Sequence, residues 1–200
     1  MAKKSDDRRI VELDEDLARF LNRLRPSAGE TVAWFGGRMP LRVASYLSAE
    51  LPPLAYITSV RALLLRDNMV MTVRDAGGTM HLLPGGRREE GETLEQTLRR
   101  EIREETGWSI GDFMPLGFLH YHHEAAVPKN YAYPYPDFVQ AVYAAQAEGY
   151  DEAGREPDGH ELDVRFRTFD DALRMPISLG NRVFLRAVMS GGPRDRRPSK

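Results

Sequence analysis

Apolar residues repeat at the spacing of an α-helix near the N-terminus and again in the middle of the chain. The first stretch, about residues 12–25, carries leucines and a phenylalanine three or four positions apart and stops before Pro26. The second, residues 93–106, begins with Thr93 and Gln96 in the pattern of a capping box and is followed by Gly107. These patterns predict two amphipathic helices. We expect a third helix at about residues 181–189.

Shorter apolar runs bounded by turn residues predict strands in the rest of the chain. Asp67-Asn68 forms a tight turn between the first two runs, and two loops are expected at residues 124–136 and 146–160. Strands combined with two or three helices predict an α/β or α+β fold with a mixed β-sheet. The expected strands are residues 61–66, 69–74, 79–83, 116–122, 138–145 and 162–169.

The first 54 residues read as an N-terminal extension. Residues 31–35 and 41–47 are separated by Gly36-Gly37 and can pair as a hairpin, and Pro52-Pro53 then interrupts the chain. We expect the extension, residues 1–54, to pack on the main domain or on a second subunit. The main domain is expected at residues 55–190, and the Gly/Pro/Arg-rich residues 191–200 are expected to be a disordered tail.

Composition excludes several classes of function. The absence of cysteine excludes disulfide scaffolds, thiolate zinc sites, iron–sulfur clusters and cysteine nucleophiles. A net charge of −2 lacks the basic excess of proteins that grip long nucleic acid. No apolar run approaches the roughly 18 residues of a membrane span, and residues 1–10 are charged rather than signal-like. We expect a cytoplasmic protein that binds neither membrane nor nucleic-acid polymer.

The predicted helix at residues 93–106 distributes its charges unusually. At about 100° per residue, three glutamates lie beside the apolar stripe, whereas Arg99 and Arg103 lie on the far side. A solvated surface helix would hold its charges away from the core. Two of the glutamates also form a like-charge pair four residues apart, which is unfavourable. The stripe is Leu94, Leu98 and Ile102, and the glutamates are Glu101, Glu104 and Glu105.

A bound divalent cation is the simplest remedy for such crowded carboxylates. Oxygen ligands without nearby sulfur or histidine favour Mg²⁺, with Mn²⁺ as a second choice. The preceding loop is rich in glycine, which lets backbone carbonyls approach a metal or a phosphate. Since Mg²⁺ usually shares its site with substrate phosphates, the helix predicts phosphoryl chemistry with water as the nucleophile.

The spacing from Gly86 through Glu92 to the segment Arg100–Trp108 resembles the Nudix box. All seven fixed positions match, and Ile102 fills the aliphatic one; Trp108 departs from the usual aliphatic residue at the last position, which should affect packing alone. The resemblance implies a mixed sheet sandwiched between helices. It also implies Mg²⁺-dependent hydrolysis of a nucleoside diphosphate linked to another group, by attack of water at phosphorus.

The same resemblance implies roles for individual residues. Those that look like metal ligands are Glu101, Glu104, Glu105 and, through its backbone carbonyl, Gly86. Glu92 looks like a supporting ligand or hydrogen-bond acceptor, and Arg100 like the residue that orients a box glutamate. The general base is Glu101, Glu104 or a carboxylate of a later loop, for which Glu161 is our candidate and Glu124 and Glu156 are weaker ones.

Other residues allow more than one interpretation. Arg87 and Arg88 are candidates for phosphate binding. Arg61 and Arg74 could also reach phosphates but are more readily explained as solubility charges on edge strands. The loop that contains Tyr133 either stacks on a substrate base or is a rigid surface loop or dimer contact. His120 and His122 share one face of a strand, which is more often packing or hydrogen bonding than metal binding, and His123 faces the other way.

Two functions from different classes remain at the sequence level. The first is a Nudix hydrolase, for which ADP-ribose or sugar nucleotides compete with oxidised nucleoside triphosphates as substrates. The second is a Nudix-fold nucleotide-binding sensor or regulator without turnover; such proteins usually carry an appended DNA-binding domain or a degraded box, and here the box is intact. We expect a homodimer with the N-terminal extension at the contact.

Overall fold

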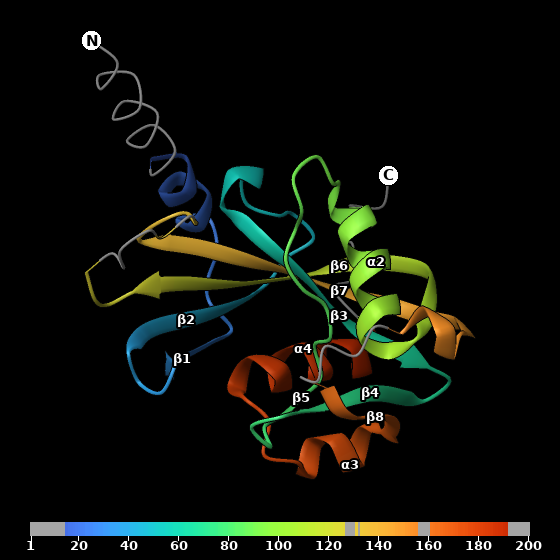
Figure 1. The fold of residues 1–200 in the computed structure, drawn as a ribbon. Helices are drawn as coiled ribbons and strands as arrows, with labels where there is room; N and C mark the ends of the chain where they lie inside the picture. The colour runs from blue at the N-terminus through green and yellow to red at the C-terminus, as the bar shows by residue number, and fades with distance from the viewer. Residues whose placement is uncertain (1–14, 127–130, 132, 156–160, 192–200) are drawn as a thin grey trace, which may run out of the picture.

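The computed structural model describes residues 15–126, 131, 133–155 and 161–191, without the side chains of residues 161 and 162. Within these residues a single mixed sheet forms the centre of the molecule (Figure 1). Its strands are β1 (Ala28–Trp34), β2 (Met39–Leu47), β3 (Ile57–Arg66), β4 (Met69–Asp75), β5 (Met80–His81), β6 (Trp108–His123), β7 (Asp137–Tyr150) and β8 (Glu161–Thr168). The predicted mixed sheet is confirmed.

The strand order is β1-β2-β6-β7-β3-β4-β5, and β8 pairs with β4 outside this path. β3 and β7 run parallel to each other, while the other pairs are antiparallel. The helices are residues 15–21, α2 (Leu94–Thr106), α3 (Phe169–Arg174) and α4 (Leu179–Met189), with 3₁₀ turns at Leu54–Tyr56 and Glu152–Gly154. None of the helices in the described part of the chain is long and apolar enough to cross a membrane.

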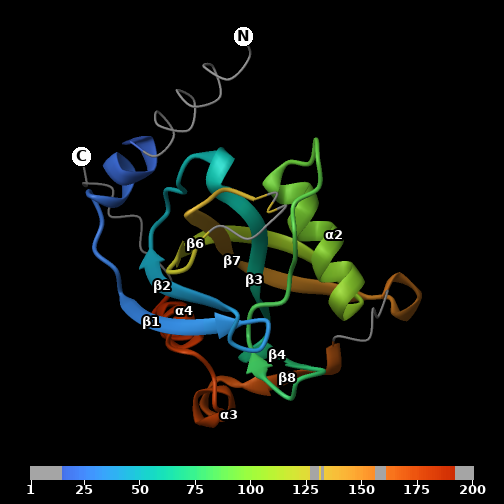
Figure 2. The same cartoon turned by 60° about the vertical axis from the view of Figure 1, so that its left-hand side comes forward.

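Helices cover both faces of the sheet (Figures 1 and 2). Because side chains alternate along a strand, β3 contributes Val60 and Leu64 to one face, where they join Ile102 of α2 in an apolar core. It contributes Leu63 to the other face, where Phe184 of α4 packs in a second core. β3 is buried on both faces along most of its length, and its polar side chains lie among its first five residues and at its last residue, Arg66.

The N-terminal extension belongs to the same sheet. β1 and β2 form the expected hairpin, and β2 continues into the sheet by pairing with β6, with Ala44 opposite His120. Of the two alternatives left by the sequence, the hairpin therefore packs on the main domain. The predicted first helix is present at residues 15–21 and ends earlier than expected, while residues 12–14 lie outside the described residues. Leu17 and Phe20 bury this helix against the core that also contains α2.

Two expectations about strand ends were wrong. β6 and β7 are longer than predicted, and residues 146–150, expected to be loop, belong to β7. The register of this pair shifts near Ile110 and again between Pro115 and Gly117. Such bulges accommodate the glycines and the proline that resemble strand breaks in the sequence. The strand predicted to reach residue 169 ends at Thr168, which instead caps α3.

The segment before α2 replaces β4 along part of β3. β3 pairs with β4 only next to their turn, at Leu65 and Arg66, and the two strands then separate. Residues 84–88 take the vacated edge: the Val60 N–H donates to the Gly86 carbonyl at 2.9 Å, and the Ala62 N–H donates to that of Pro84 at 3.0 Å. This exchange of partners carries the segment before α2, residues 84–91, to the N-terminal end of β3, between α2 and the hairpin. We call this segment the glycine loop.

Candidate active site

Local sequence signals fix where α2 begins and ends. The Thr93 hydroxyl accepts a hydrogen bond from the Gln96 N–H, and the Gln96 side chain accepts one from the Thr93 N–H, so the predicted capping box is confirmed. Gly107 ends the helix in the left-handed conformation at φ 74°. Trp108 then packs between the rings of Tyr150 and Phe166. These contacts hold the helix in a defined rotation about its axis.

That rotation directs Glu101 and Glu105 toward the glycine loop and places Glu104 beside Arg100. The side chains of Glu101, Glu105 and Glu104 are 14%, 18% and 34% exposed. The Gly85 N–H donates to Glu105 Oε2 at 2.6 Å. Glu101 lies against Gly86 so closely that its carboxylate occupies the space of any β-carbon there. The expected position of the glutamates at the border of the apolar stripe is confirmed, and the glycines are what allow them to approach the loop.

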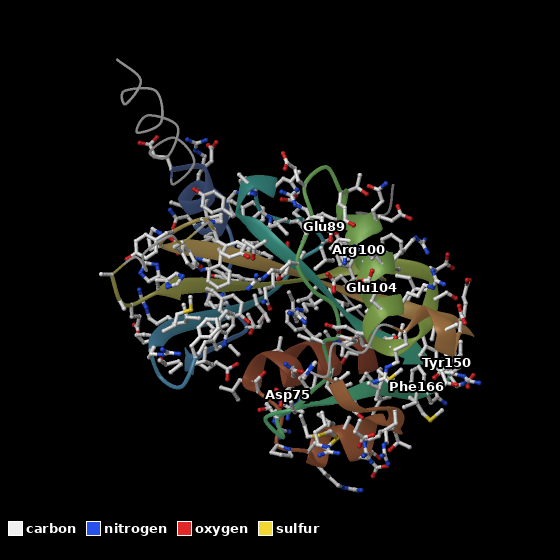
Figure 3. All side chains as sticks on the ribbon, viewed as in Figure 1. Asp75, Glu89, Arg100, Glu104, Tyr150 and Phe166 are labelled. Carbon is white, nitrogen blue, oxygen red and sulfur yellow. The ribbon has the colours of Figure 1, made fainter. Side chains whose placement is uncertain are left out.

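Arg100 organises this group of acidic side chains. It donates from Nε and Nη2 to both oxygens of Glu92, at 2.7 and 2.9 Å. Its Nη1 donates to Glu101 at 2.8 Å and to Glu104 at 3.0 Å, and Figure 3 shows it beside Glu104 on α2. The hydrogen bonds from Arg100 lower the pKa of Glu92 to about 2, although burial opposes them. Arg100 thus holds Glu92 ionised and fixes the positions of Glu101 and Glu104.

The donor chemistry fits a hard divalent cation. Glu92 and the three box glutamates place four carboxylates close together, and the ion pairs among the described residues join them to Arg100 and Arg61. Burial raises the pKa of Glu101 despite its contact with Arg100, so this carboxylate gains from a further positive charge. The Gly86 carbonyl already accepts from Val60 and keeps a second lone pair for a ligand.

The glutamates themselves are not arranged as a ready metal site. Among the described residues, no group of three histidine, aspartate or glutamate side chains has the geometry to hold a metal ion. Arg100 Nη1 instead lies within hydrogen-bonding distance of both Glu101 and Glu104. Binding of a cation would therefore require Glu101 and Glu104 to turn away from this nitrogen.

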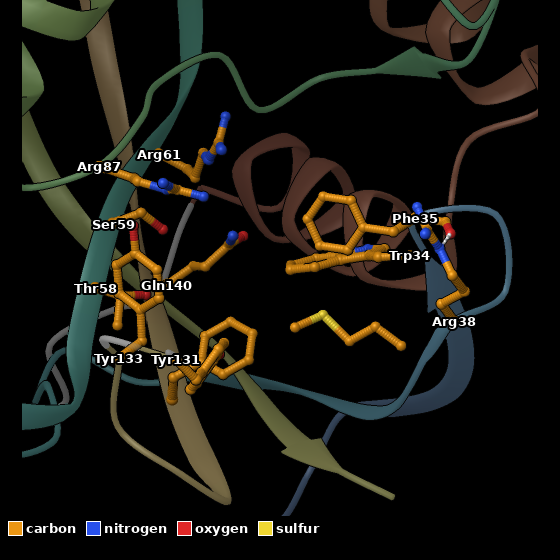
Figure 4. Close-up of a pocket in the computed structure, with 12 residues that line it drawn as sticks. Trp34, Phe35, Arg38, Thr58, Ser59, Arg61, Arg87, Tyr131, Tyr133 and Gln140 are labelled. Carbon is orange, nitrogen blue, oxygen red and sulfur yellow. Dashed lines mark hydrogen bonds between the residues drawn. The ribbon is translucent and has the colours of Figure 1, made fainter. Parts of the chain in front are cut away.

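A pocket of about 540 Å³ lies beside the glycine loop, on the face of the sheet that carries α4 (Figure 4). One wall comes from the β1–β2 hairpin and the opposite wall from the exposed end of β3, with β7 between them. Aromatic rings and arginines dominate the lining. The lining residues are Trp34, Phe35, Arg38, Met39, Thr58, Ser59, Arg61, Arg87, Tyr131, Tyr133, Phe138 and Gln140.

Arg61 joins this pocket to the glutamates, which corrects the sequence-based interpretation. β3 is an internal strand, so Arg61 is not a solubility charge on an edge. Its part-buried guanidinium lies 4.0 Å from the Glu105 carboxylate and also lines the pocket. The pairing of β3 with the glycine loop, rather than any local pattern, brings Arg61 here. The same pairing explains why sequence reasoning missed it.

The structure brings Arg87 and Tyr133 together in the pocket. The Arg87 guanidinium lies over the Tyr133 ring, 4.8 Å from its centroid. Arg87 pairs with Ser59 on β3, and both line the pocket. Arg88, the next residue along this extended segment, is directed to the opposite side by strand alternation. Of the predicted substrate-binding residues, Arg87 and Tyr133 therefore share the pocket, and Arg88 does not contribute to its walls.

The candidate bases outside α2 lie in different parts of the molecule. The backbone of Glu161 pairs with Asp75, which lies well away from Glu104 in Figure 3, and the Glu161 side chain lies outside the described residues. Glu124 forms an ion pair with Arg42 of β2 at 3.1 Å. Glu156 also lies outside the described residues, as do residues 192–200 of the predicted tail.

The histidines make hydrogen bonds rather than a metal cluster. His120 Nε2 and His122 Nδ1 donate to the same oxygen of Asp137, at 2.7 and 2.9 Å. His123 faces the other side of β6 and is hydrogen-bonded to the hydroxyl of Tyr131. The predicted arrangement of the three side chains on β6 is confirmed.

The sequence did not predict that residues of the β1–β2 hairpin line the pocket. Trp34 and Phe35 lie beside Gly36-Gly37, which indicated a turn but not what the turn would face. Gln140 and Ser59 lie within apolar strands and carry no motif of their own. The available signal was the occurrence of polar residues inside strands that are otherwise apolar.

Comparison with known proteins agrees with this geometry. A family model described as the NUDIX domain matches residues 55–188. No curated protein matches the chain. Among solved structures, the pyrophosphohydrolase BsRppH of Bacillus subtilis shares 15% identity over 82% of this chain and 98% of its own, with a TM-score of 0.55.

Two further structures show a similar likeness of fold. A NUDIX hydrolase from Nitrosomonas europaea is 20% identical over 72% of this chain and 97% of its own, with a TM-score of 0.52. The NUDIX domain of NrtR from Shewanella oneidensis, solved in complex with ADP ribose, is 22% identical over 68% of this chain and 88% of its own, with a TM-score of 0.51. At these identities the likeness concerns the fold.

Proposed function

This chain belongs to the NUDIX family of hydrolases, enzymes that act on phosphoanhydride bonds, and we propose that it is a Mg²⁺-dependent pyrophosphohydrolase of a nucleoside diphosphate derivative. The observation that carries the proposal is the contact of Glu101 and Glu105 with the glycine loop, with Glu104 on the same helix beside Arg100, next to a pocket that presents Arg61 and Arg87. Carboxylates beside a cationic, aromatic pocket suit a substrate with a charged diphosphate and a ring system.

Divalent metal ions are general cofactors of this family, and Mg²⁺ is our choice here, with Mn²⁺ possible in its place. The residues that would hold the ion are Glu101, Glu104, Glu105 and the Gly86 carbonyl, with Glu92 and Arg100 in support. When bound, a divalent cation neutralises charge on the diphosphate and acidifies water.

The chain's own residues bind and orient the substrate. Arg61 and Arg87 lie between the carboxylates and the aromatic part of the pocket, where their guanidinium groups can donate to phosphate oxygens. Tyr133 packs against Arg87 and adds an aromatic surface beside it. This arrangement sets the diphosphate across the glycine loop and directs the rest of the substrate toward the hairpin.

In the proposed step, the oxygen of water forms a bond to one phosphorus, and the bond from that phosphorus to the bridging oxygen breaks. A glutamate takes the proton from the water, and the electrons of the broken bond stay on the leaving phosphate. Glu101 and Glu104 on α2 are the candidates for this base, whereas Glu161, the first residue of β8, stays a prediction from the sequence alone. Positioned acid–base groups contribute about 10²–10⁴-fold to such rates.

The test combines two variants with a substrate panel. Glu104→Gln and Glu105→Gln should each lower Mg²⁺-dependent turnover about 100-fold or more, because each removes a carboxylate of the proposed metal site. Glu95→Gln is the matched control, since Glu95 lies on the exposed side of the same helix and pairs with Arg99. Full turnover by both variants on a substrate of the native protein would refute the assignment.

The panel also identifies the substrate. ADP-ribose and sugar nucleotides yield a mononucleotide and a sugar phosphate when the diphosphate is cleaved, whereas oxidised nucleoside triphosphates yield a mononucleotide and pyrophosphate. The alternative function, a nucleotide-binding regulator without turnover, predicts saturable binding with no product from any member of the panel. The structure of the NrtR NUDIX domain with ADP ribose makes that compound the first to include.

We also propose that the chain is a homodimer with the N-terminal extension, residues 1–54, at the contact. The support is that β1 lies at the end of the strand order. Among the described residues it pairs with β2 on one side, so its other edge is available for contact with a second copy of the chain. Light scattering on the purified protein should give twice the 22.7 kDa chain mass, and a monomeric mass would exclude the dimer.

A further inference from the structure

A buried hydroxyl in the pocket has no hydrogen-bond partner among the residues that the structure describes. Ser59 is 3% exposed and lines the pocket, and its Oγ is the single buried side-chain polar atom without a hydrogen-bond partner among those described. Buried polar groups are nearly always hydrogen-bonded, because leaving one unpaired is costly. A hydroxyl held in this way on a rigid strand is suited to a ligand atom that enters the pocket.

The facing wall exposes aromatic surface. Trp34 packs one part of its indole against Tyr121 and Phe138, which fixes the ring, and it lines the pocket. Phe35 is 63% exposed at the pocket mouth and has a left-handed backbone, φ 51°, which side chains other than glycine rarely adopt. An exposed phenylalanine on a strained turn has no evident benefit to the isolated fold, whereas both features suit contact with a flat apolar ligand.

The order of groups across the pocket gives it a direction. Figure 4 shows Trp34 and Phe35 across the pocket from Ser59, with Arg61 and Arg87 at the side of Ser59. Arg61 in turn reaches Glu105. A substrate whose diphosphate lies at the arginines and glutamates therefore has its other end between the hairpin and β3.

We propose that this end of the pocket is a nucleobase site, with Trp34 as the stacking surface and Ser59 as the group that reads a polar edge atom of the base. The proposal rests on the proposed function and deepens it, since it names the part of the substrate that the N-terminal hairpin recognises. Trp34 and Phe35 lie outside residues 55–188, which match the NUDIX family model, so the residues that would recognise the base precede the matched region in the sequence.

The test measures binding of mononucleotides without catalysis. The chain has two tryptophans, so in the Trp108→Phe variant the tryptophan fluorescence comes from Trp34 alone. In EDTA, AMP, GMP, CMP and UMP are titrated against this full-length variant, with ribose 5-phosphate as the probe that lacks a base. At least one mononucleotide should quench Trp34 saturably and bind about tenfold more tightly than ribose 5-phosphate.

Variants assign the two residues. Trp34→Leu should remove that tenfold difference when binding is measured by calorimetry, and Trp34→Phe should keep most of it because stacking tolerates a smaller ring. Ser59→Ala should weaken the preferred mononucleotide about three- to tenfold and reduce discrimination among the four bases. Met114→Ala is the control for loss of an exposed apolar side chain outside the pocket.

The kinetic readout separates recognition from structural damage. On the hydrolysed substrate, Trp34→Leu should raise KM with little change in kcat, as expected for loss of binding that is equal in ground and transition states. Equal binding of ribose 5-phosphate and all four mononucleotides by the native protein would overturn the base site. So would retention of the tenfold difference in Trp34→Leu.

The two proposals can fail separately. If no diphosphate substrate is hydrolysed but mononucleotides bind at Trp34, the base site stands and the hydrolase proposal falls. If Glu104→Gln abolishes hydrolysis while Trp34→Leu leaves both KM and mononucleotide binding unchanged, the hydrolase proposal stands and the base site falls.

Discussion

Two adjacent glycines in the loop before α2 are needed for different reasons, and a pair of substitutions separates them. A β-carbon on Gly86 would meet the carboxylate of Glu101, the end of a flexible side chain that can move aside. Gly86→Ala should therefore lower turnover at least tenfold while leaving the melting temperature within a few degrees of the native value, because the displaced group is a proposed ligand. Enzyme assays and thermal melting test this together.

Gly85→Ala is the matched comparison. Gly85 has φ 127°, and a β-carbon there would press on the backbone carbonyl of Val60, which cannot move without disturbing β3. This variant should lose stability as well as activity. Native turnover in Gly86→Ala would contradict the proposed contact between Glu101 and the active centre.

The lowered pKa of His81 predicts that the folded protein loses stability in mild acid. Burial, and then the charge of Arg61, lower its pKa from 6.5 to about 4. Between these values the unfolded chain binds a proton that the folded chain does not, so the free energy of unfolding decreases as the pH falls from about 6.5 toward 4. At pH 5 the loss from this group is on the order of 2 kcal/mol relative to pH 7.

Urea unfolding of the native protein and of His81→Gln, each at pH 7 and pH 5, isolates this contribution. The decrease between the two pH values should be smaller in His81→Gln, because the variant lacks the titrating group while keeping the other acids and bases. An equal decrease in both proteins would show that His81 is accessible and titrates normally.

Site residues that are close together in the sequence could be predicted, whereas those far apart in the sequence could not. Glu101, Glu104 and Glu105 lie within one helical turn or so of each other, and helix geometry alone places them together. Arg61 and Ser59 join them only because residues 84–88 replace β4 at the edge of β3. Trp34 arrives through the pairing of β2 with β6. Such encounters depend on strand order, which no local pattern encodes.

Among the elements, α2 begins at a capping box formed by its own residues. Its capping box satisfies backbone donors that would otherwise be unpaired at the helix start. Thr93→Ala should therefore reduce the free energy of unfolding by about 1 kcal/mol. Since the helix start also adjoins Glu92, turnover should fall as well. The measurement is urea unfolding, with Glu95→Gln as the control on the same helix. Unchanged stability in Thr93→Ala would mean that packing alone fixes the helix.

Helices and strands differed in how well the sequence predicted them. The caps of α2 were predicted to the residue, because capping chemistry is local. The lengths of β6 and β7 were underestimated, because Gly111, Pro115 and Gly149 resemble breaks and are absorbed by bulges or edge positions in the paired strands. α3 was missed since six residues are too few to show a helical repeat.

At the scale of the whole molecule, the N-terminal hairpin and the NUDIX-matching region act as one unit. The hairpin extends the sheet through β2 and β6, and α4 packs against both parts. A Glu30 carboxylate on β1 accepts from the Gly180 N–H near the start of α4 at 3.2 Å. The pocket therefore lies between two segments that are held together by backbone pairing, so its width is set by the fold.

The same coupling predicts that a divalent cation stabilises the entire chain. The folded protein gathers the box glutamates around Arg100, so an ion that binds these carboxylates in the folded state alone should raise the free energy of unfolding. At a Mg²⁺ concentration tenfold above the dissociation constant, the gain is about 1.4 kcal/mol and appears as a higher melting temperature.

The double variant Glu101→Gln/Glu105→Gln should lose this shift, whereas Glu95→Gln should retain it. Melting curves in MgCl₂ and in KCl of equal ionic strength separate binding from general screening, because KCl screens the surface without occupying the site. If the Mg²⁺ shift survives in the double variant, the ion binds elsewhere, and the proposed role of α2 in catalysis loses its basis.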